Sequence, residues 1–161
     1  MQLSRLDYEL LRELQADARK SKKELAKKLG VSAVTVAAHI SRLEKLGVIL
    51  RYVTILNPDA FGLSLEAAIE ISVQGGHIVE VEKELSKNPS VYAVYDVTGD
   101  SDVLIFTRFR SRDELSKFVK SVLGNPYVLR TNTRLILTTI KRSLEIPFSN
   151  DSEKKARKAS S

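Results

Sequence analysis

Apolar residues recur every three or four positions in three stretches near the start of the chain. This spacing places them on one side of a helix, so each stretch predicts an amphipathic helix with a buried face. Ser4 can cap the first helix, and Asp7 adds favourable negative charge to its first turn. The three predicted buried faces are Leu6, Leu10, Leu11 and Leu14; Leu25, Ala26 and Leu29; and Val36, Ile40 and Leu43.

Capping residues mark the ends of the second and third helices. Ser21 and Glu24 form a capping-box pattern at the start of the second helix. Gly30 can adopt the left-handed conformation that ends a helix, and Ser32 can cap the next one. Residues 21–46 therefore predict two helices joined by a tight turn, which is a helix-turn-helix.

A stretch rich in β-branched and aromatic residues follows. Residues 48–56, VILRYVTIL, have the composition of a strand. Residues 57–59, Asn-Pro-Asp, predict a turn directly after it. We expect this strand and turn to form a hinge, with a domain boundary near residues 52–63.

Strand patterns and helix patterns alternate in the second half of the chain. The expected buried helix faces are Ile78, Val81 and Leu85, and then Leu115, Phe118, Val119 and Val122. The expected series is a strand at 65–73, a helix within 77–88, strands at 91–97 and 103–109, a helix opened by a capping box at Ser111 and Glu114, and a strand at 127–140. This β-α-β-β-α-β order is that of a ferredoxin-like sheet with both helices on one face.

These patterns predict an α+β chain in four parts. Residues 1–51, which we call the head, contain the helix-turn-helix, and residues 52–63 form the hinge strand and linker. Residues 64–148 form the ferredoxin-like domain. Residues 149–161 are rich in Ser, Lys and Ala without an apolar period, so we expect a basic mobile tail.

The predicted sheet has apolar residues on both faces. The two sets are Val103, Ile105, Leu135 and Leu137 on one face, and Leu104, Phe106, Ile136 and Ile140 on the other. Two helices on one face cannot cover both sets. We therefore expect a symmetric dimer that buries the second face.

Charge is distributed unevenly along the 161 residues. The head has eleven Lys or Arg against six Asp or Glu, a balance of +5, whereas residues 52–148 have eleven against twelve, a balance of −1. The last thirteen residues add +2, for a total of +6. A basic helix-turn-helix module beside a nearly neutral domain is typical of a DNA-binding head on a domain with another task.

The outward face of the third helix suits DNA. Its side chains are short near the start and basic near the end, as in a helix that reads bases with its N-terminal residues and touches phosphates elsewhere. Lysines on the preceding helix would contact phosphates. The alternative is an ordinary solvated helix surface. The candidate DNA contacts are Lys22, Lys23, Ser32, Val34, Thr35, Ala38, His39 and Arg42.

Composition argues against several other kinds of site. There are no cysteines, which excludes disulfides, thiolate metal sites and cysteine nucleophiles. The two histidines, His39 and His77, lie in different segments, and no set of side chains has the spacing of a catalytic centre. Asp100 and Asp102 supply only two ligands for a hard cation, which makes a weak site. We therefore expect no enzyme activity, cofactor or bound metal.

No apolar run approaches the roughly 20 residues that a membrane helix needs, and Met1 is not followed by a signal sequence. We expect a cytoplasmic protein without a membrane partner.

Four segments in this order resemble the Lrp/AsnC family of prokaryotic transcription regulators, the feast/famine proteins. They are ELAKKLGVSAVTVAAHISRLEKLGVI, RYVTILNPDAFGL, VYAVYDVTGDSD and TNTRLILTTIK, and the resemblance covers about residues 3–142. It implies a winged-type helix-turn-helix and a ligand-sensing domain that assembles dimers into larger, often octameric, particles. Amino acids or related metabolites are the implied effectors.

The resemblance also assigns roles to individual residues. The family's DNA-reading helix matches residues 32–45, where His39 stands at a position that is often arginine. The family's effector loop resembles residues 98–102, where Ser101 stands at the place of a frequent aromatic residue. The implied effector site consists of Thr98, Gly99, Asp100, Ser101 and Asp102, with Thr131 and Thr133 from the last strand.

We therefore expect a sequence-specific, DNA-binding transcription regulator whose assembly and DNA binding respond to a small molecule, such as an amino acid. The alternative is an architectural protein that wraps or compacts DNA without an effector. The basic tail and the departure at Ser101 favour the alternative. Binding of amino acids distinguishes the two.

Overall fold

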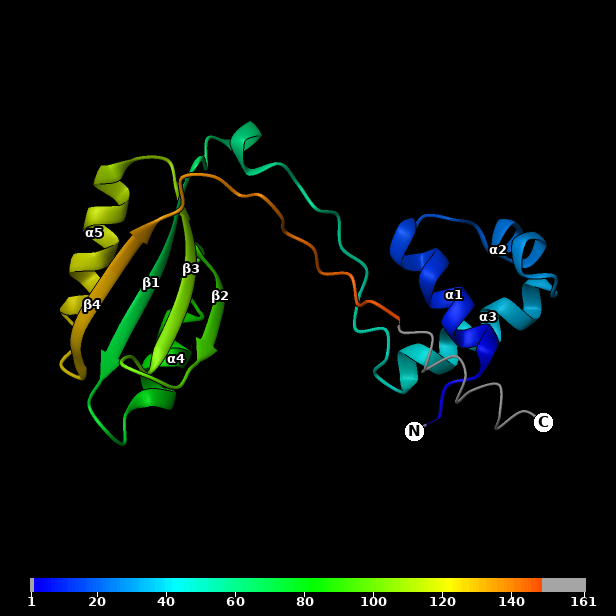
Figure 1. The fold of residues 1–161 in the computed structure, drawn as a ribbon, viewed down its shortest axis with the longest axis horizontal. Helices are drawn as coiled ribbons and strands as arrows, with labels where there is room; N and C mark the ends of the chain where they lie inside the picture. The colour runs from blue at the N-terminus through cyan, green and yellow to red at the C-terminus, as the bar shows by residue number, and fades with distance from the viewer. Residues whose placement is uncertain (1, 149–161) are drawn as a thin grey trace. The chain divides into compact units, whose positions relative to one another are not determined.

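The computed structural model describes residues 2–148, which form two compact units (Figure 1). The first unit contains the chain up to Ile55 together with the chain from Ser143 onward, and the second is Leu56–Arg142. The C-terminal segment 143–148 thus packs with the head and not with the ferredoxin-like domain, to which the sequence pattern assigns it. The predicted tail, residues 149–161, lies outside the described residues.

The head consists of three helices, as predicted. They are α1 (Arg5–Ala16), α2 (Lys22–Leu29) and α3 (Ala33–Lys45). Gly30 adopts the left-handed conformation with a φ of 69° and ends α2, and the Ser32 side chain accepts the Thr35 N–H at the start of α3. The buried core combines all three helices and consists of Leu10, Leu11, Leu14, Leu25, Ala26, Val36 and Leu43.

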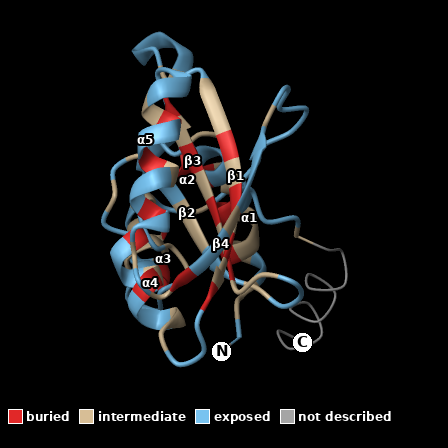
Figure 2. Cartoon of the chain, turned by 90° about the vertical axis from the view of Figure 1, so that its left-hand side faces the viewer, coloured by how far each residue is buried: buried red, intermediate tan, exposed pale blue. Residues whose placement is uncertain are grey.

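The second unit contains a four-stranded antiparallel sheet, confirming the predicted order of elements. Its elements are β1 (Leu65–Val73), α4 (Ile78–Leu85), β2 (Val91–Asp96), β3 (Val103–Phe109), α5 (Arg112–Leu123) and β4 (Val128–Leu135), in the spatial order β2-β3-β1-β4. We call residues 65–135 the sheet domain. Alternate residues of β1 and β3 pack with α4 and α5 in one core, so both helices cover the same face (Figure 2).

The predicted hinge strand at residues 48–56 is not a strand in the described chain. Pro58–Phe61 forms a short 3-10 helix after it, and the Asn57 side chain accepts the Asp59 N–H in the predicted turn. Leu50 and Ile55 are 86% and 80% exposed. Strand propensity describes how well a residue packs on a sheet, and this segment has no neighbouring strand within the described chain.

The final strand is shorter than predicted. Leu135 pairs with Ala67, and the Ile136 N–H donates to the Glu66 carbonyl at 2.9 Å. Because β1 begins at Leu65, the described chain beyond Ile136 has no partner strand, and Leu137 is 94% exposed. Buried and half-buried residues alternate along β3, which confirms the two predicted faces on that strand. The prediction is wrong for residues 137–140, because β4 ends at Leu135.

The face of the sheet opposite the helices, which we call the open face, mixes aromatic and charged side chains. Glu66 accepts hydrogen bonds from the Tyr92 hydroxyl and from Arg142. The Arg108 guanidinium lies 4.0 Å from the centre of the Tyr92 ring, a cation–π contact. Phe106 packs near Tyr92 and Tyr95.

The start of α5 also differs from its prediction. The Ser111 side chain accepts the Glu114 N–H, as a cap should, but the Glu114 carboxylate accepts the Arg110 N–H at 2.8 Å. The capping box at Ser111 is therefore one-sided. Among the described helices, none is long and apolar enough to cross a membrane.

Candidate nucleic-acid interface and effector loop

The outer face of α3 is open at the positions that the sequence singled out. Val34 is 79% exposed, although it is apolar and lies in the first turn of the helix. Ser32 is also exposed, and Thr35 is half-buried beside it. A small apolar surface at the N-terminal end of a recognition helix is suited to contact with thymine methyl groups.

Two hydroxyl groups meet at the start of α3. The oxygens of Ser32 and Thr35 lie 2.8 Å apart, and the Ser32 oxygen also accepts the Thr35 N–H at 3.0 Å. Both side chains therefore contribute to the cap, and both remain at the end of the helix that would approach base edges.

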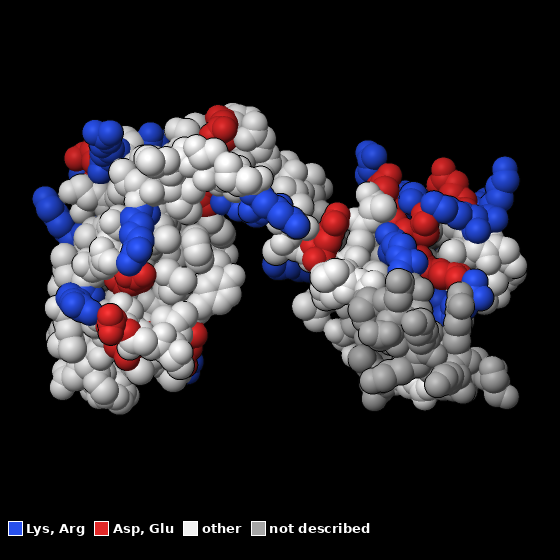
Figure 3. Space-filling model, viewed as in Figure 1, with Lys and Arg blue, Asp and Glu red and all other residues white. Residues whose placement is uncertain are grey.

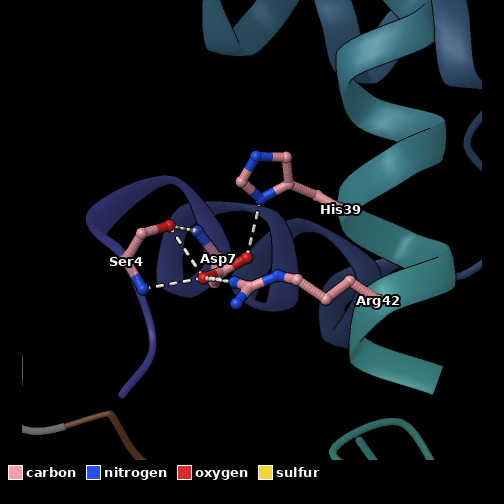
Figure 4. A network of polar contacts seen from close by, with 4 residues as sticks. All are labelled: Ser4, Asp7, His39 and Arg42. Atoms are coloured by element: carbon pink, nitrogen blue, oxygen red, sulfur yellow. Dashed lines mark hydrogen bonds and ion pairs between the residues drawn. The ribbon is translucent and has the colours of Figure 1, made fainter. Parts of the chain in front are cut away.

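Of the remaining candidate contacts on α3, Ala38 is exposed, whereas His39 and Arg42 are held by a residue of α1 (Figure 4). The His39 Nδ1 lies 2.7 Å from Asp7 Oδ1, and Arg42 donates to Asp7 Oδ2. Asp7 also closes a capping box with Ser4 at the start of α1. Asp7 is fully buried, so a single carboxylate connects α3 to α1.

The charge of this carboxylate is stabilised by its partners. Burial raises the pKa of Asp7, but hydrogen bonds from Arg42, His39 and Ser4 lower it more, to about 2. Asp7 is therefore ionised at neutral pH, because its pKa lies far below 7.

His39 and Arg42 consequently have a structural contact in addition to any DNA contact. Their side chains are 25% and 43% exposed, so each retains an outward portion. Sequence reasoning missed this role, although one signal was present. Asp7 occupies the apolar stripe of α1 together with Leu10, Leu11 and Leu14, and an acid on such a stripe indicates a buried, paired charge.

The lysines of the head differ in how freely they can meet phosphates. Lys22 and Lys23 are exposed in the first turn of α2, where the helix N-terminus also favours anions. Lys20 and Lys28 both bind Glu13 at 2.7 Å. Basic and acidic side chains are accordingly mixed over the head (Figure 3). The basic field is weaker than the number of lysines suggests.

The predicted effector loop, residues 98–102, joins β2 to β3. Gly99 has a φ of 125°, which is unfavourable for residues with a side chain. Within the part of the chain that the structure describes, no backbone acceptor is found for the amide N–H groups of Gly99, Asp100 and Ser101. Three adjacent amides in a turn can bind a carboxylate.

The two acidic residues of the loop have different surroundings. The Asp102 carboxylate accepts the Val73 N–H at 2.8 Å, next to the point where the pairing of β1 with β4 shifts. Its backbone N–H donates to the Ile71 carbonyl, so Asp102 fastens the loop to β1. Asp100 is exposed, and its side chain carries no such bond among the described residues.

A basic residue that the sequence did not single out lies at the loop. Arg130 donates to the Asp100 carbonyl at 3.0 Å and to the Ser72 hydroxyl at 3.2 Å. Arg130 pairs with Ser72 across the strands, which places both side chains on the open face. No local pattern reveals this contact, because the three residues come from three segments.

The two predicted threonines lie on the other side of the sheet. Thr131 pairs with Ile71 and Thr133 with Ile69, and both isoleucines are buried beneath the helices. Directly paired residues share a face of the sheet. Within one chain, the structure therefore does not bring the threonines together with Asp100 and Arg130.

Comparison with known proteins agrees with the division of the chain into the head and the sheet domain. A model described as Lrp/AsnC ligand binding domain matches residues 66–146, and one described as winged helix-turn-helix DNA-binding matches residues 3–49. The chain belongs to the Lrp/AsnC family. Its members are transcription regulators and not enzymes, so this protein is a DNA-binding regulator.

Lrp/AsnC relatives match nearly the whole chain. An uncharacterized HTH-type transcriptional regulator of Pyrococcus furiosus is 39% identical over 146 residues, which are 91% of this chain and 99% of that protein. The HTH-type transcriptional regulator FL11 of Pyrococcus horikoshii is 32% identical over 146 residues, covering 91% of this chain and 97% of that protein. A solved Neisseria meningitidis transcriptional regulator in complex with L-Met is similar at 25% identity, with a TM-score of 0.84 over 90% of this chain and 96% of that chain.

Proposed function

We propose that this regulator recognises specific sequences in double-stranded DNA through α3 and that an amino acid bound at residues 98–102 changes its assembly and its affinity for DNA. The observation that carries the DNA part is the exposed outer face of α3 at the end of a capped, rigid turn. The observation that carries the effector part is the amide-lined loop beside Arg130 and Asp100.

The DNA contacts divide by chemistry. Val34, Thr35 and Ala38 present methyl groups and a hydroxyl to base edges, which can discriminate between base pairs. Lys22 and Lys23 bind phosphates and add affinity without sequence preference. Arg42 and His39 are oriented by Asp7, and we assign them to the DNA backbone.

The proposed effector site contains groups that can bind both charged ends of an amino acid. The amides of residues 99–101 and the Arg130 guanidinium can bind the carboxylate, and the exposed Asp100 carboxylate can bind the ammonium. Asp102 holds the loop in shape. The L-Met complex of the similar Neisseria meningitidis regulator supports an amino acid as the effector class.

Titration calorimetry against a panel of amino acids tests this site. We expect at least one amino acid to bind the unmodified protein, and we expect Asp100→Asn to abolish its binding. Asp113→Asn is the matched control, because Asp113 is an exposed carboxylate on α5. If no amino acid binds or changes the affinity for DNA, the effector role fails and the architectural alternative replaces it.

We also propose that the chain acts as a homodimer and that dimers assemble further, to an octamer. The hinge residues have strand composition but no partner strand within the described chain, and a second copy would supply one. The open face presents Tyr92, Tyr95 and Phe106, and a second copy would cover these rings as well.

A further inference from the structure

The hydrogen bonds of Asp7 determine the chemical form of His39. Asp7 Oδ2 accepts the N–H and the O–H of Ser4, each at 2.7 Å, and it also accepts from Arg42. Asp7 Oδ1 is 2.7 Å from the His39 Nδ1. An ionised carboxylate only accepts hydrogen bonds, so the Nδ1 of His39 must carry the hydrogen.

This assignment leaves the other ring nitrogen with two possible states. The Nε2 of His39 points away from the carboxylate (Figure 4). In the neutral ring, with its hydrogen on Nδ1, Nε2 is an acceptor and cannot bind a phosphate oxygen. In the imidazolium, Nε2 carries a hydrogen and donates.

The position of His39 favours a phosphate as its partner. It lies at the middle of α3, one turn beyond Thr35 and one turn before Arg42. Recognition helices read bases mainly with their N-terminal residues and touch the backbone elsewhere. A phosphate at this point would also be attracted by the Arg42 guanidinium beside it.

We infer that Asp7 is a positioning residue that restricts His39 to binding a DNA phosphate as the imidazolium, so that each DNA-bound head takes up a proton at His39. This inference rests on the proposed DNA-binding face of α3. The proton goes to the His39 Nε2, which then donates to the phosphate oxygen. Asp7 keeps its negative charge throughout.

The charged groups at the ring are consistent with such a coupling. Asp7, from α1, favours the imidazolium, and Arg42, from α3, opposes it across the same carboxylate. A DNA phosphate on the Nε2 side would add a second negative group, which interacts more favourably with the imidazolium than with the neutral ring.

The test is the pH dependence of DNA binding by the full chain. Binding of a labelled duplex of mixed sequence is measured by fluorescence anisotropy at constant ionic strength between about pH 5.5 and 8.5, where histidine titrates. We expect the affinity to fall as the pH rises, by up to about tenfold per pH unit for each bound head. The chain has only two histidines, which makes the assignment simple.

Three variants separate the contributions of His39, His77 and Asp7 to the pH dependence of DNA binding. His39→Asn retains an amide near the Nδ1 position but has no titrating group, and its binding should not depend on pH. His77→Asn is the control, because His77 lies in the sheet domain, stacked on Tyr127, and this variant should keep the full dependence. Asp7→Asn frees the tautomer of His39, so its slope with pH should be shallower than that of the unmodified protein.

The outcomes distinguish the inference from the function on which it rests. DNA binding that does not change with pH, or a slope that survives in His39→Asn, overturns the inference alone. Absence of DNA binding at every pH overturns the proposed DNA contacts as well. If Asp7→Asn lowers the affinity equally at all pH values while its circular dichroism remains that of a folded protein, Asp7 has only a structural role.

Discussion

Asp7 connects the start of α1 to two side chains of the recognition helix, and its pKa of about 2 makes that connection sensitive to acid. The pKa lies below the ordinary value of 3.8. A depressed pKa stabilises the folded state above the unfolded value, and this stabilisation is lost as the pH falls through the folded value. The difference between these two pKa values of Asp7 corresponds to about 2 kcal/mol of unfolding free energy.

We predict that the unfolding free energy of the head is lower in Asp7→Asn at neutral pH and that the difference from the unmodified protein shrinks between about pH 4 and pH 2. Urea unfolding, followed through the amide NMR signals of α1 and α3, measures this free energy at each pH. Asp17→Asn is the control, because Asp17 is paired only on the surface with Arg19. A difference that stays constant with pH would contradict the proposed energetic role.

Single residues were predictable where their role is local. Ser32 and Gly30 act on backbone groups within a few positions, so their types and spacing are sufficient to predict them. The bonds of Asp7 to His39 and of Asp102 to Val73 join residues separated by 32 and 29 positions. Such pairs depend on packing that no spacing rule contains.

At the scale of elements, the predictions fail where a partner is required. Periodicity identified the α-helices and strands of the described chain, because these elements bury a continuous face. Residues 48–56 and 137–140 have the same β-rich composition, but neither has a neighbouring strand in the described chain. A strand ends where its neighbour ends, which composition does not reveal.

The segment 143–148 packs against the head. The Gln15 side chain exchanges two hydrogen bonds with the Ile146 backbone, at 2.8 and 3.2 Å, and Phe148 packs edge-on against Tyr8. Phe148 also joins the core of the head and lies 6.0 Å from the Arg12 guanidinium. The C-terminal segment thus adds apolar contacts to α1.

We predict that Phe148→Ala lowers the stability of the head by about 1–2 kcal/mol, since a partly buried ring contributes less than the roughly 3–5 kcal/mol of a fully buried one. Hydrogen exchange of the α1 amides reports this change. Leu144→Ala is the matched control, because Leu144 is 80% exposed. Equal exchange in the two variants would show that the segment does not stabilise the head.

For the whole molecule, exposed apolar residues predict self-association. Large apolar side chains are exposed to solvent in the hinge and in the chain after β4, among them Leu50, Ile55, Leu137 and Ile140. Patches of this kind are rare on monomers. Multi-angle light scattering should show a dimer or a larger particle at micromolar concentration. Ile55→Lys should weaken this self-association. A monodisperse species of 18.0 kDa would contradict the proposed assembly.

Binding of DNA as a function of salt concentration tests the central claim most directly. If the head contacts phosphates through Lys22 and Lys23, a dimer with about 6 to 10 such contacts should lose about 10³ to 10⁵ in affinity between roughly 50 and 200 mM salt. Replacing Lys22 or Lys23 with Ala should make the log–log slope shallower by about 1 for each phosphate that is no longer neutralised. Lys28→Ala, which removes a lysine of α2 that is bound to Glu13, should change the slope less. A flat plot for the unmodified protein would contradict DNA binding by the head.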